Sequence, residues 1–420
     1  MNVRPKGSAL PGRFIIFALG RGISALGDSL GGMAILWLVA VEWEQAAAFA
    51  AIGAAFSIVR VLLGPLAGAF ADHCSNRTVM VAAEVLQACM SLGAGWLAAT
   101  GLLTLPAVAG LMSIKAVAGL FFGPSARVYV SRAVAADALS RANGLQSGLG
   151  RIGGIAGPLL AGLVVEGLGI SWAFALDGLS FFLSAAVCLA VVPATRARAS
   201  ATTDSKGLVN IVQASREGIR TVWQNRPLRT VALTLSLVNM NLSGAMYAVT
   251  VFAPRVLKAD AAGVGLLQSS IQAGVLIGSA ALTLVRIRAS TGVLAMAPVV
   301  LTVGVILMGV GFVKSLPVLT ALMLAYGLAI SVTAVAGELY YQTLIPVDIR
   351  GRVMSVSSTI ESALQPAGSL AAGLLLEAGL YSALFLGAGG VCIFLAVPLM
   401  RSVQELAGLR GSKETFHNMR

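Results

Sequence analysis

The chain is divided into long apolar stretches, and these limit its possible folds more than any other feature. Twelve of them are long enough to cross a bilayer, which takes about 20 mostly apolar residues per helix. They lie at about residues 14–40, 46–71, 78–100, 105–127, 144–166, 171–193, 230–253, 262–285, 292–313, 316–341, 353–376 and 380–401. The sequence therefore predicts an all-α integral membrane protein with twelve transmembrane helices.

The basic residues predict an orientation in the membrane. Only 11% of the residues are charged, yet the formal net charge is +12. Of the 29 Lys and Arg residues, 22 lie in segments on the same side as the N-terminus, three in loops on the other side and four in or beside the stretches. Because cytoplasmic loops carry an excess of Lys and Arg, we expect a multi-pass protein of the bacterial inner membrane with both termini in the cytoplasm. The positive charge then needs no nucleic-acid partner.

One long polar segment divides the stretches into two groups of six. The sequence predicts an N-terminal half at 1–193, a cytoplasmic central loop at 194–229, a C-terminal half at 230–402 and a cytoplasmic tail at 403–420. The halves resemble each other, because residues 127–169 align with 338–380 without a gap at an offset of 211 residues. Parallel repeats of this kind form transporters that handle substrate near the membrane midplane.

The turn after the second stretch carries the first family resemblance. Gly68, Asp72 and Arg77 have the spacing of the signature loop of the major facilitator superfamily, a glycine followed by Asp-Arg-x-Gly-Arg-Arg/Lys. His73 and Asn76 stand where that pattern has basic residues. In the family this loop is a cytoplasmic latch that holds the outward-open state, so the resemblance implies a latch with fewer positive partners.

The fifth stretch carries a second resemblance. It is similar to the G-x-x-x-G-P-x-x-G-G element of exporter branches of the superfamily, and its matching residues are Gly153, Gly157, Pro158 and Gly162. Proline removes a backbone donor, and glycines let a neighbouring helix approach closely. The resemblance implies a gating helix, and ordinary helix packing is the alternative.

Local patterns before the fifth and eleventh stretches resemble the macrolide-efflux and enterobactin-exporter type of these proteins. The two segments match each other in the repeat, with Asp137 over Asp348 and Arg141 over Arg352. We therefore add these four residues to the predicted latch. The resemblance implies export of an amphipathic drug, such as a macrolide, or of a siderophore made by the cell.

Ionisable residues inside the stretches are the candidates for coupling transport to protons, because each costs about 2.5–3.5 kcal/mol at the bilayer centre on insertion scales. Asp28 is the first choice, since it lies deep in the first stretch and Asn239 takes its place in the repeat. Lys115 and Arg151 are its possible counter-charges. Desolvation favours the protonated form of a carboxylate, so Asp28 is suited to load and release a proton. Contact with a cationic substrate and a structural pair with a nearby Lys or Arg are the alternatives.

Other polar residues in the stretches have weaker assignments. Glu338 and Glu361 are second coupling candidates, and they stand over Arg127 and Gly150 in the repeat. A solvated or latch role near the cytoplasmic end explains them equally well. We interpret Arg21, Arg60 and Glu84 as long side chains that reach the membrane surface. Predicted cavity-lining residues are Asn239, Asn241, Gln268 and Gln272. Hydrogen bonding between helices explains these four amides about as well.

The sequence has no G-x-x-x-x-G-K-[ST] loop, and its two histidines lie in cytoplasmic segments. We therefore expect a carrier that uses the proton gradient, not an enzyme, with no metal and no bound cofactor. The expected partners are a small-molecule substrate and membrane lipid, and the expected functional form is a monomer. The alternatives are an importer or a lysophospholipid flippase on the same fold, or a membrane receptor or scaffold that transports nothing.

Overall fold

The computed structural model describes residues 10–43, 45, 47–48, 53, 63, 75–193, 219–284, 295–345 and 347–409. Every regular element in this part of the chain is helical. The elements of the N-terminal side are α1 (Gly12–Trp37), the π-helical turn η1 (Leu38–Glu42), α3 (Asn76–Ala99), α4 (Leu105–Ala133), the short η2 (Ala136–Ala138), α5 (Leu139–Leu168) and α6 (Ile170–Val191). Those of the C-terminal side are α8 (Arg226–Val256), α9 (Ala261–Leu284), α11 (Met296–Val310), α12 (Leu316–Leu344), α13 (Val347–Ala363), α14 (Gln365–Glu377) and α15 (Tyr381–Leu409).

These helices confirm the predicted fold class. Nine of the described helices are long and apolar enough to cross a membrane. The shorter apolar helix α11 occupies the ninth predicted stretch, and α13 and α14 together occupy the eleventh. The second predicted stretch, residues 46–71, lies almost wholly outside the described residues.

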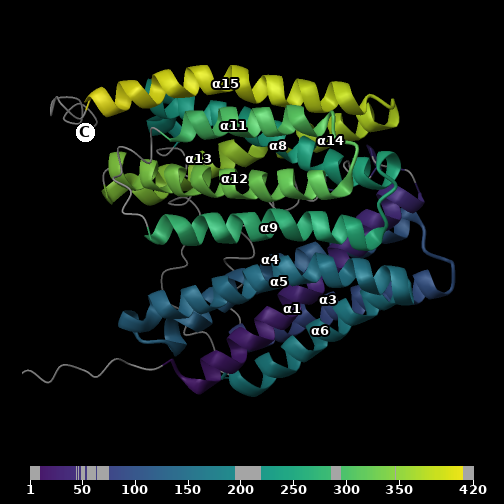
Figure 1. Ribbon diagram of the computed structural model, residues 1–420. Coiled ribbons are helices and arrows are strands. Elements are labelled where there is room, and N and C mark those ends of the chain that lie inside the picture. Colours follow the sequence, from purple (N-terminus) through teal and green to yellow (C-terminus); the bar gives the residue numbers. More distant parts are fainter. Residues whose placement is uncertain are drawn as a thin grey trace, which may run out of the picture. The chain divides into compact units, whose positions relative to one another are not determined.

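The chain forms two compact units, and the helices pair in the same way inside each. The first unit contains residues 1–44, 55–200 and 258–269, and the second contains 45–54, 201–257 and 270–420. In the first unit α1 packs on α5 and α6, while α3 packs on α4 and α6 (Figure 1). In the second, α8 packs on α14 and α15, while α11 packs on α12 and α15.

The offset of 211 residues also relates the helix boundaries of the two units. Helices α4 and α12 begin at Leu105 and Leu316, and both have 29 residues. Helices α6 and α15 begin at Ile170 and Tyr381, again 211 positions apart. Positions in these helices can therefore be compared residue by residue between the units.

The counterpart of α5 is broken. Helix α5 continues through Pro158, whereas the matching segment of the second unit is interrupted at Leu364, between α13 and α14. Pro366 follows in the first turn of α14, and proline offers no amide hydrogen to the carbonyl four residues earlier. The two units therefore differ in the continuity of this helix.

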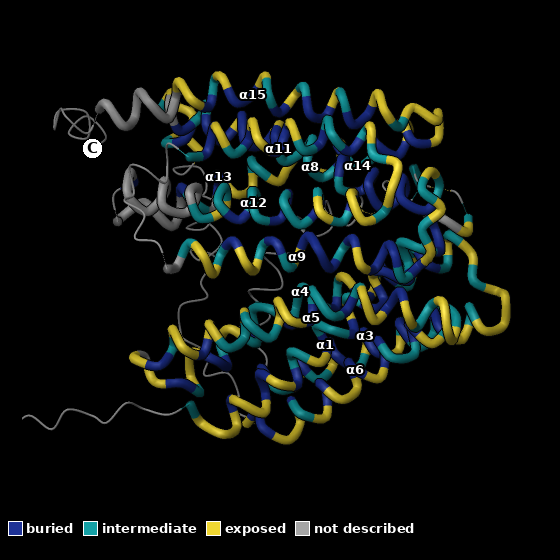
Figure 2. The backbone as a smooth tube through the Cα atoms, viewed as in Figure 1, coloured by how far each residue is buried: buried dark blue, intermediate teal, exposed yellow. Residues whose placement is uncertain are grey.

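Two apolar clusters form the core of the first unit. One includes Phe14, Phe17 and Met80, and the other includes Ala34 and Phe174. Buried and exposed positions alternate along each helix (Figure 2), and the exposed side chains include many large apolar ones, as expected of helices that face lipid. The polar residues of interest lie along the helices between the two clusters.

Candidate functional site

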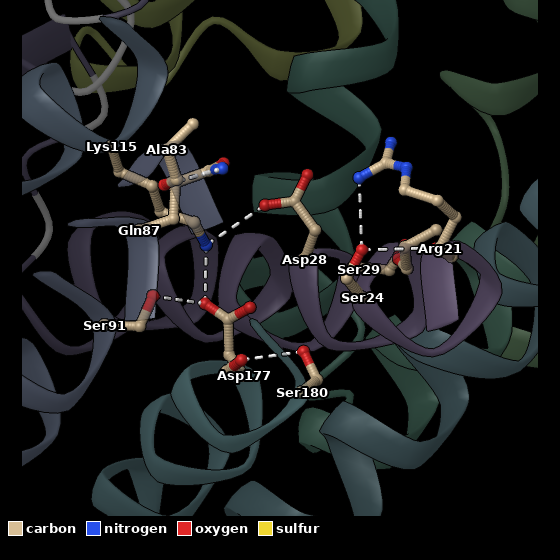
Figure 3. Close-up of polar contacts among 11 residues, drawn as sticks. Arg21, Ser24, Asp28, Ser29, Ala83, Gln87, Ser91, Lys115, Asp177 and Ser180 are labelled. Carbon is tan, nitrogen blue, oxygen red and sulfur yellow. Dashed lines mark hydrogen bonds and ion pairs between the residues drawn. The ribbon is translucent and has the colours of Figure 1, made fainter. Parts of the chain in front are cut away.

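Lys115 in α4 is the centre of a charged cluster in the first unit. Its Nζ lies 3.0 Å from Oδ1 of Asp28 in α1 and 2.5 Å from Oδ2 of Asp177 in α6. Figure 3 shows the ammonium group between the two carboxylates. Nζ also lies 4.8 Å from the centre of the Phe181 ring, which is within the range of a cation–π interaction. One cation is thus shared by carboxylates from two helices.

The two carboxylates differ in how much of each side chain is exposed. The Asp177 side chain is fully buried, whereas 63% of the Asp28 side chain is exposed. Ser91 in α3 donates a hydrogen bond of 2.7 Å to Oδ2 of Asp177 (Figure 3). Oδ1 of Asp177 is buried without a hydrogen-bond partner among the described residues. Asp177 is therefore the fixed member of the cluster and Asp28 the accessible one.

Gly31 in α1 determines how closely this helix approaches Asp177. A Cβ added at Gly31 would lie 2.9 Å from Cγ of Asp177 and still closer to Oδ2. Real Cβ atoms essentially never come that close to another heavy atom, so any larger residue would displace the carboxylate. The sequence forms this cluster only because α1 has no side chain at position 31.

A second ion pair lies between α1 and α3. Nη1 of Arg21 is 3.2 Å from Oε1 of Glu84, and its guanidinium lies 4.2 Å from the centre of the Phe122 ring. The Glu84 side chain is fully buried. The interpretation of Glu84 as a side chain that reaches the membrane surface is therefore wrong, because its charge is compensated inside the helix bundle.

Two of the five predicted coupling residues, Asp28 and Lys115, come together in the cluster. Arg151 is exposed on α5 and forms no ion pair with another described residue. Glu361 lies in α13 of the second unit, where it lines a cavity of about 550 Å³. Glu338 lies in α12, and its side chain is outside the part that the structure describes.

The predicted latch is only partly within the described residues. Gly68 and Asp72 lie outside them, as do the side chains of Asp348 and Arg352. Arg77 lies in the first turn of α3 and is half-buried. Asp137 in η2 and Arg141 in α5 are exposed at the start of the fifth transmembrane segment. The latch role of these residues stays a prediction.

The predicted gating residues Gly153, Gly157, Pro158 and Gly162 all lie in the continuous helix α5. A Cβ at Gly153 would lie 3.0 Å from the backbone nitrogen of Leu26 in α1, and one at Gly157 would lie 3.0 Å from the Leu26 carbonyl oxygen. A Cβ at Gly162 would overlap the carbonyl oxygen of Ala261, at the start of α9. The glycines thus bring α5 close to α1 and to the first residues of α9, which belong to the first unit.

The four predicted cavity residues separate into different environments. Asn239 in α8 lines the cavity of the second unit, and its Nδ2 donates to the backbone oxygen of Glu361 at 3.1 Å. Asn241 instead joins α8 to α15, because its Nδ2 donates to the backbone oxygen of Ala388 at 2.5 Å. Gln268 is half-buried and Gln272 is exposed, and neither lines that cavity.

Sequence reasoning counts Asp177, the buried partner of Lys115, among the acidic residues of the apolar stretches but assigns it no role. It lies 62 positions from Lys115 in the chain. The repeat is the signal that could have singled it out, since the offset of 211 places the neutral Ala388 at its position. Charge differences between matched helices therefore point to all three residues of the cluster.

Comparisons with known proteins agree with this architecture. The family model of transmembrane secretion effectors matches residues 12–417. The multidrug efflux pump Tap of Mycobacterium tuberculosis is 28% identical over 404 residues, which cover 91% of this chain and 92% of that protein. The pump of the same name from Mycolicibacterium fortuitum is 26% identical over 385 residues, which cover 88% of this chain and 91% of that protein.

Several solved structures of transporters have the same fold at low sequence identity. The nucleoside transporter NupG superposes with a TM-score of 0.73 at 13% identity, covering 93% of this chain and 99% of that one. A bacterial homologue of the iron transporter ferroportin gives a TM-score of 0.68 at 16% identity, covering 94% and 100%. With the family match over nearly its whole length, the chain belongs to the transmembrane secretion effectors, a transporter family of the major facilitator superfamily.

Proposed function

We propose that this membrane transporter is a secondary active exporter, which moves an amphipathic small molecule out of the cell in exchange for protons. The observation that carries the proposal is the sharing of Lys115 between the buried Asp177 and the accessible Asp28. The relatives in Mycobacterium tuberculosis and Mycolicibacterium fortuitum are named as multidrug efflux pumps, which supports the direction of transport.

The formal charge of the cluster explains why a proton would be taken up there. Two ionised carboxylates and one ammonium group leave a net charge of −1 within a helix bundle, where an uncompensated charge is costly. A proton on Asp28 removes that charge and leaves Lys115 paired with Asp177 alone. The buried pair then stays intact in both states, and the exposed carboxylate changes its charge.

The proposed cycle couples this change to alternating access. With the site open to the cytoplasm, Asp28 is deprotonated and the carrier binds its substrate. Both six-helix halves then rearrange and open the site outward, as in transporters built from parallel repeats. A proton from outside binds Asp28, the substrate leaves, and the protonated carrier returns and releases the proton inside.

The proposed substrate is a drug or antibiotic, such as a macrolide, or a siderophore made by the cell. The proposed carrier acts as a monomer in the inner membrane, with both termini, the central loop at 194–229 and the tail at 403–420 in the cytoplasm. We keep three further roles that the sequence predicts. The transporter consists of two six-helix halves, at 1–193 and 230–402. The latch residues hold the outward-open state, and the glycines of α5 form the gating helix. The distribution of Lys and Arg supports this orientation.

Reconstituted vesicles test the proposal. A pH gradient of either direction is imposed on vesicles that contain the full-length protein, and the flux of a labelled macrolide, a catecholate siderophore or a lysophospholipid is measured. We expect the macrolide or the siderophore to cross the membrane in the direction opposite to the protons. Asp28→Asn should insert normally and lose the dependence on the gradient, whereas Glu166→Gln, which removes an exposed carboxylate from α5, should keep it.

The other outcomes are equally specific. Flux in the direction of proton movement would indicate an importer, and lipid exchange that ignores the gradient would indicate a flippase. No flux of any of the three compounds by the wild-type protein would favour a receptor or scaffold. Normal pH-dependent transport by Asp28→Asn would remove Asp28 from the coupling mechanism.

A further inference from the structure

The second unit contains a cavity that the coupling mechanism does not use. Its volume of about 550 Å³ falls within the roughly 300–1,000 Å³ that is usual for small-molecule sites. Residues of α8, α11, α12, α13 and α14 line it, and all of these belong to the second unit. The cavity is therefore a property of one compact unit.

The repeat relates this cavity to the charged cluster of the first unit. At the offset of 211 residues, Tyr326 takes the position of Lys115 and Asn239 takes that of Asp28, and both line the cavity. Ala388 takes the position of Asp177. The second unit thus has neutral residues where the first has its ion pairs, and an open space beside them.

One carboxylate distinguishes the lining from an ordinary apolar void. Among the described residues that line the cavity, Glu361 is the one that carries a formal charge at neutral pH, and its counterpart in the first unit is Gly150. Most of the remaining lining is apolar and includes Met246, Met354 and the ring of Tyr326. Thioether and aromatic side chains adapt to ligands of varied shape, and an aromatic face attracts a cation.

The backbone at Glu361 is held in place by α8. Oγ of Ser236 donates to the backbone oxygen of Ile360 at 2.7 Å, and Nδ2 of Asn239 donates to that of Glu361 at 3.1 Å. On the other side of the break, Oγ of Ser243 donates to the backbone oxygen of Gln365 at 2.8 Å. Interrupted transmembrane helices of this kind are a common feature of substrate sites in transporters.

From this geometry we propose that the cavity binds an amphipathic organic cation, with Glu361 as its counter-charge. The inference rests on the proposed export function and specifies the charge class of its substrate and the unit that holds it. The apolar lining takes the hydrophobic body of the ligand, while the carboxylate selects a cation over a neutral or anionic molecule of the same size. An anion of that shape would meet repulsion from Glu361 in a medium of low dielectric constant.

Tetraphenylphosphonium and tetraphenylborate are suitable probes, because they have nearly the same shape and opposite charge. Equilibrium binding of each labelled ion to the purified full-length protein in lipid nanodiscs is measured without a gradient. We expect the wild-type protein to bind the cation, and Glu361→Gln to weaken that binding at least ten-fold, which corresponds to about 1.4 kcal/mol. Glu166→Gln should leave the affinity unchanged.

A second variant tests the cavity independently of its charge. Ala334→Leu adds apolar volume to the lining and keeps Glu361, so it should weaken binding of the cation by filling space. Thermal melting of each variant identifies any that fail to fold. A wild-type protein that does not bind the cation, a Glu361→Gln variant with unchanged affinity, or an equal affinity for both ions would overturn the inference.

The same proteins separate this inference from the proposed function. If gradient-driven flux of a substrate persists while Glu361→Gln binds the cation as well as the wild type does, the export function stands and the cavity assignment fails. If the cation binds through Glu361 but no gradient drives its flux in vesicles, the cavity assignment stands and the proton-coupled function fails.

Discussion

Lys115 carries one positive charge between two carboxylates, so substitutions in this cluster should have unequal effects on stability. Lys115→Gln leaves the buried Asp177 without a counter-charge, and breaking a buried pair in this way costs about 3–5 kcal/mol. Asp28→Asn leaves the Lys115–Asp177 pair intact and changes an exposed side chain, so we expect a loss within about 1 kcal/mol. Thermal melting in detergent measures both.

The double variant Lys115→Gln/Asp177→Asn is the control for this expected difference in stability, because it removes both charges of the buried pair. It should be more stable than Lys115→Gln alone. Equal melting temperatures for Lys115→Gln and Asp28→Asn would contradict the assignment of Asp177 as the fixed partner.

Adjacent glycines in α1 provide a matched test of the Asp177 site. Gly31→Ala places a methyl group against the Asp177 carboxylate, whereas Gly32→Ala places one in open space, since nothing lies within 4 Å of a Cβ there. We expect Gly31→Ala to lower the melting temperature and abolish gradient-driven transport, and Gly32→Ala to behave like the wild type. Similar behaviour of the two variants would show that α1 and Asp177 are not in such close contact.

The sequence was sufficient to select Asp28 and Lys115, because an ionisable residue in an apolar stretch is unusual and expensive. It was not sufficient to pair them with Asp177, because that contact depends on how α1, α4 and α6 pack. Glu84 was misinterpreted for the same reason. A carboxylate near the end of an apolar stretch can reach the surface or be paired inside, and only the position of Arg21 decides between them.

At the level of helices, close packing of α8 against α14 holds the interrupted segment in place. A Cβ at Gly368 in α14 would overlap the carbonyl oxygen of Met240 in α8. Gly368→Ala should therefore destabilise the protein by about 1–3 kcal/mol, the usual cost of overpacking. Gly387→Ala in α15 is the control, because nothing lies within 4 Å of a Cβ at that position.

Melting temperatures and binding of tetraphenylphosphonium measure the effect of this pair of variants. Because Gly368 packs on the helix that holds the backbone of Glu361, its substitution should weaken binding as well as stability. If Gly368→Ala matched Gly387→Ala in both measurements, the close contact of α8 and α14 would be excluded.

The interruption of this segment shows how far the helices could be predicted from apolar stretches alone. Residues 353–376 form one predicted stretch, yet the structure has two helices that meet at Leu364. Proline gives no sufficient signal, since α5 continues through Pro158. What differs is the presence of Ser236, Asn239 and Ser243 on α8, whose side chains satisfy backbone oxygens on both sides of the break.

For the whole molecule, the orientation in the membrane is the first prediction that can be tested. Cysteines are introduced one at a time at Lys258 and Lys314 in the predicted outer loops, and at Arg141 and Arg410 on the predicted cytoplasmic side, after Cys74 and Cys89 are replaced by serine. Of the four native cysteines, Cys188 and Cys392 are buried and are kept. An impermeant maleimide should label the first two in intact cells and the others only after permeabilisation. Labelling in the reverse pattern would place the termini outside and contradict the orientation expected from the basic residues.

The two units carry different charged residues, so we expect the first unit to couple transport to protons and the second to bind the substrate. Asp28 and Lys115 belong to the first unit, and the cavity with Glu361 belongs to the second. Asp28→Asn should then retain substrate exchange across vesicles at equal pH while it loses accumulation driven by a gradient. Glu361→Gln should raise the KM for a cationic substrate while its transport stays dependent on the gradient.

The different effects of the two variants follow from the role of each carboxylate. A carrier that binds its substrate but takes up no proton can still exchange that substrate between the two sides of the membrane. Tracer counterflow at equal pH measures exchange, and uptake under an imposed gradient measures coupling, in the same vesicle preparation. If Asp28→Asn raised the KM and Glu361→Gln abolished the response to the gradient, the two roles would be assigned to the wrong units. Loss of both activities in each variant, with normal folding, would mean that a single site serves binding and coupling together.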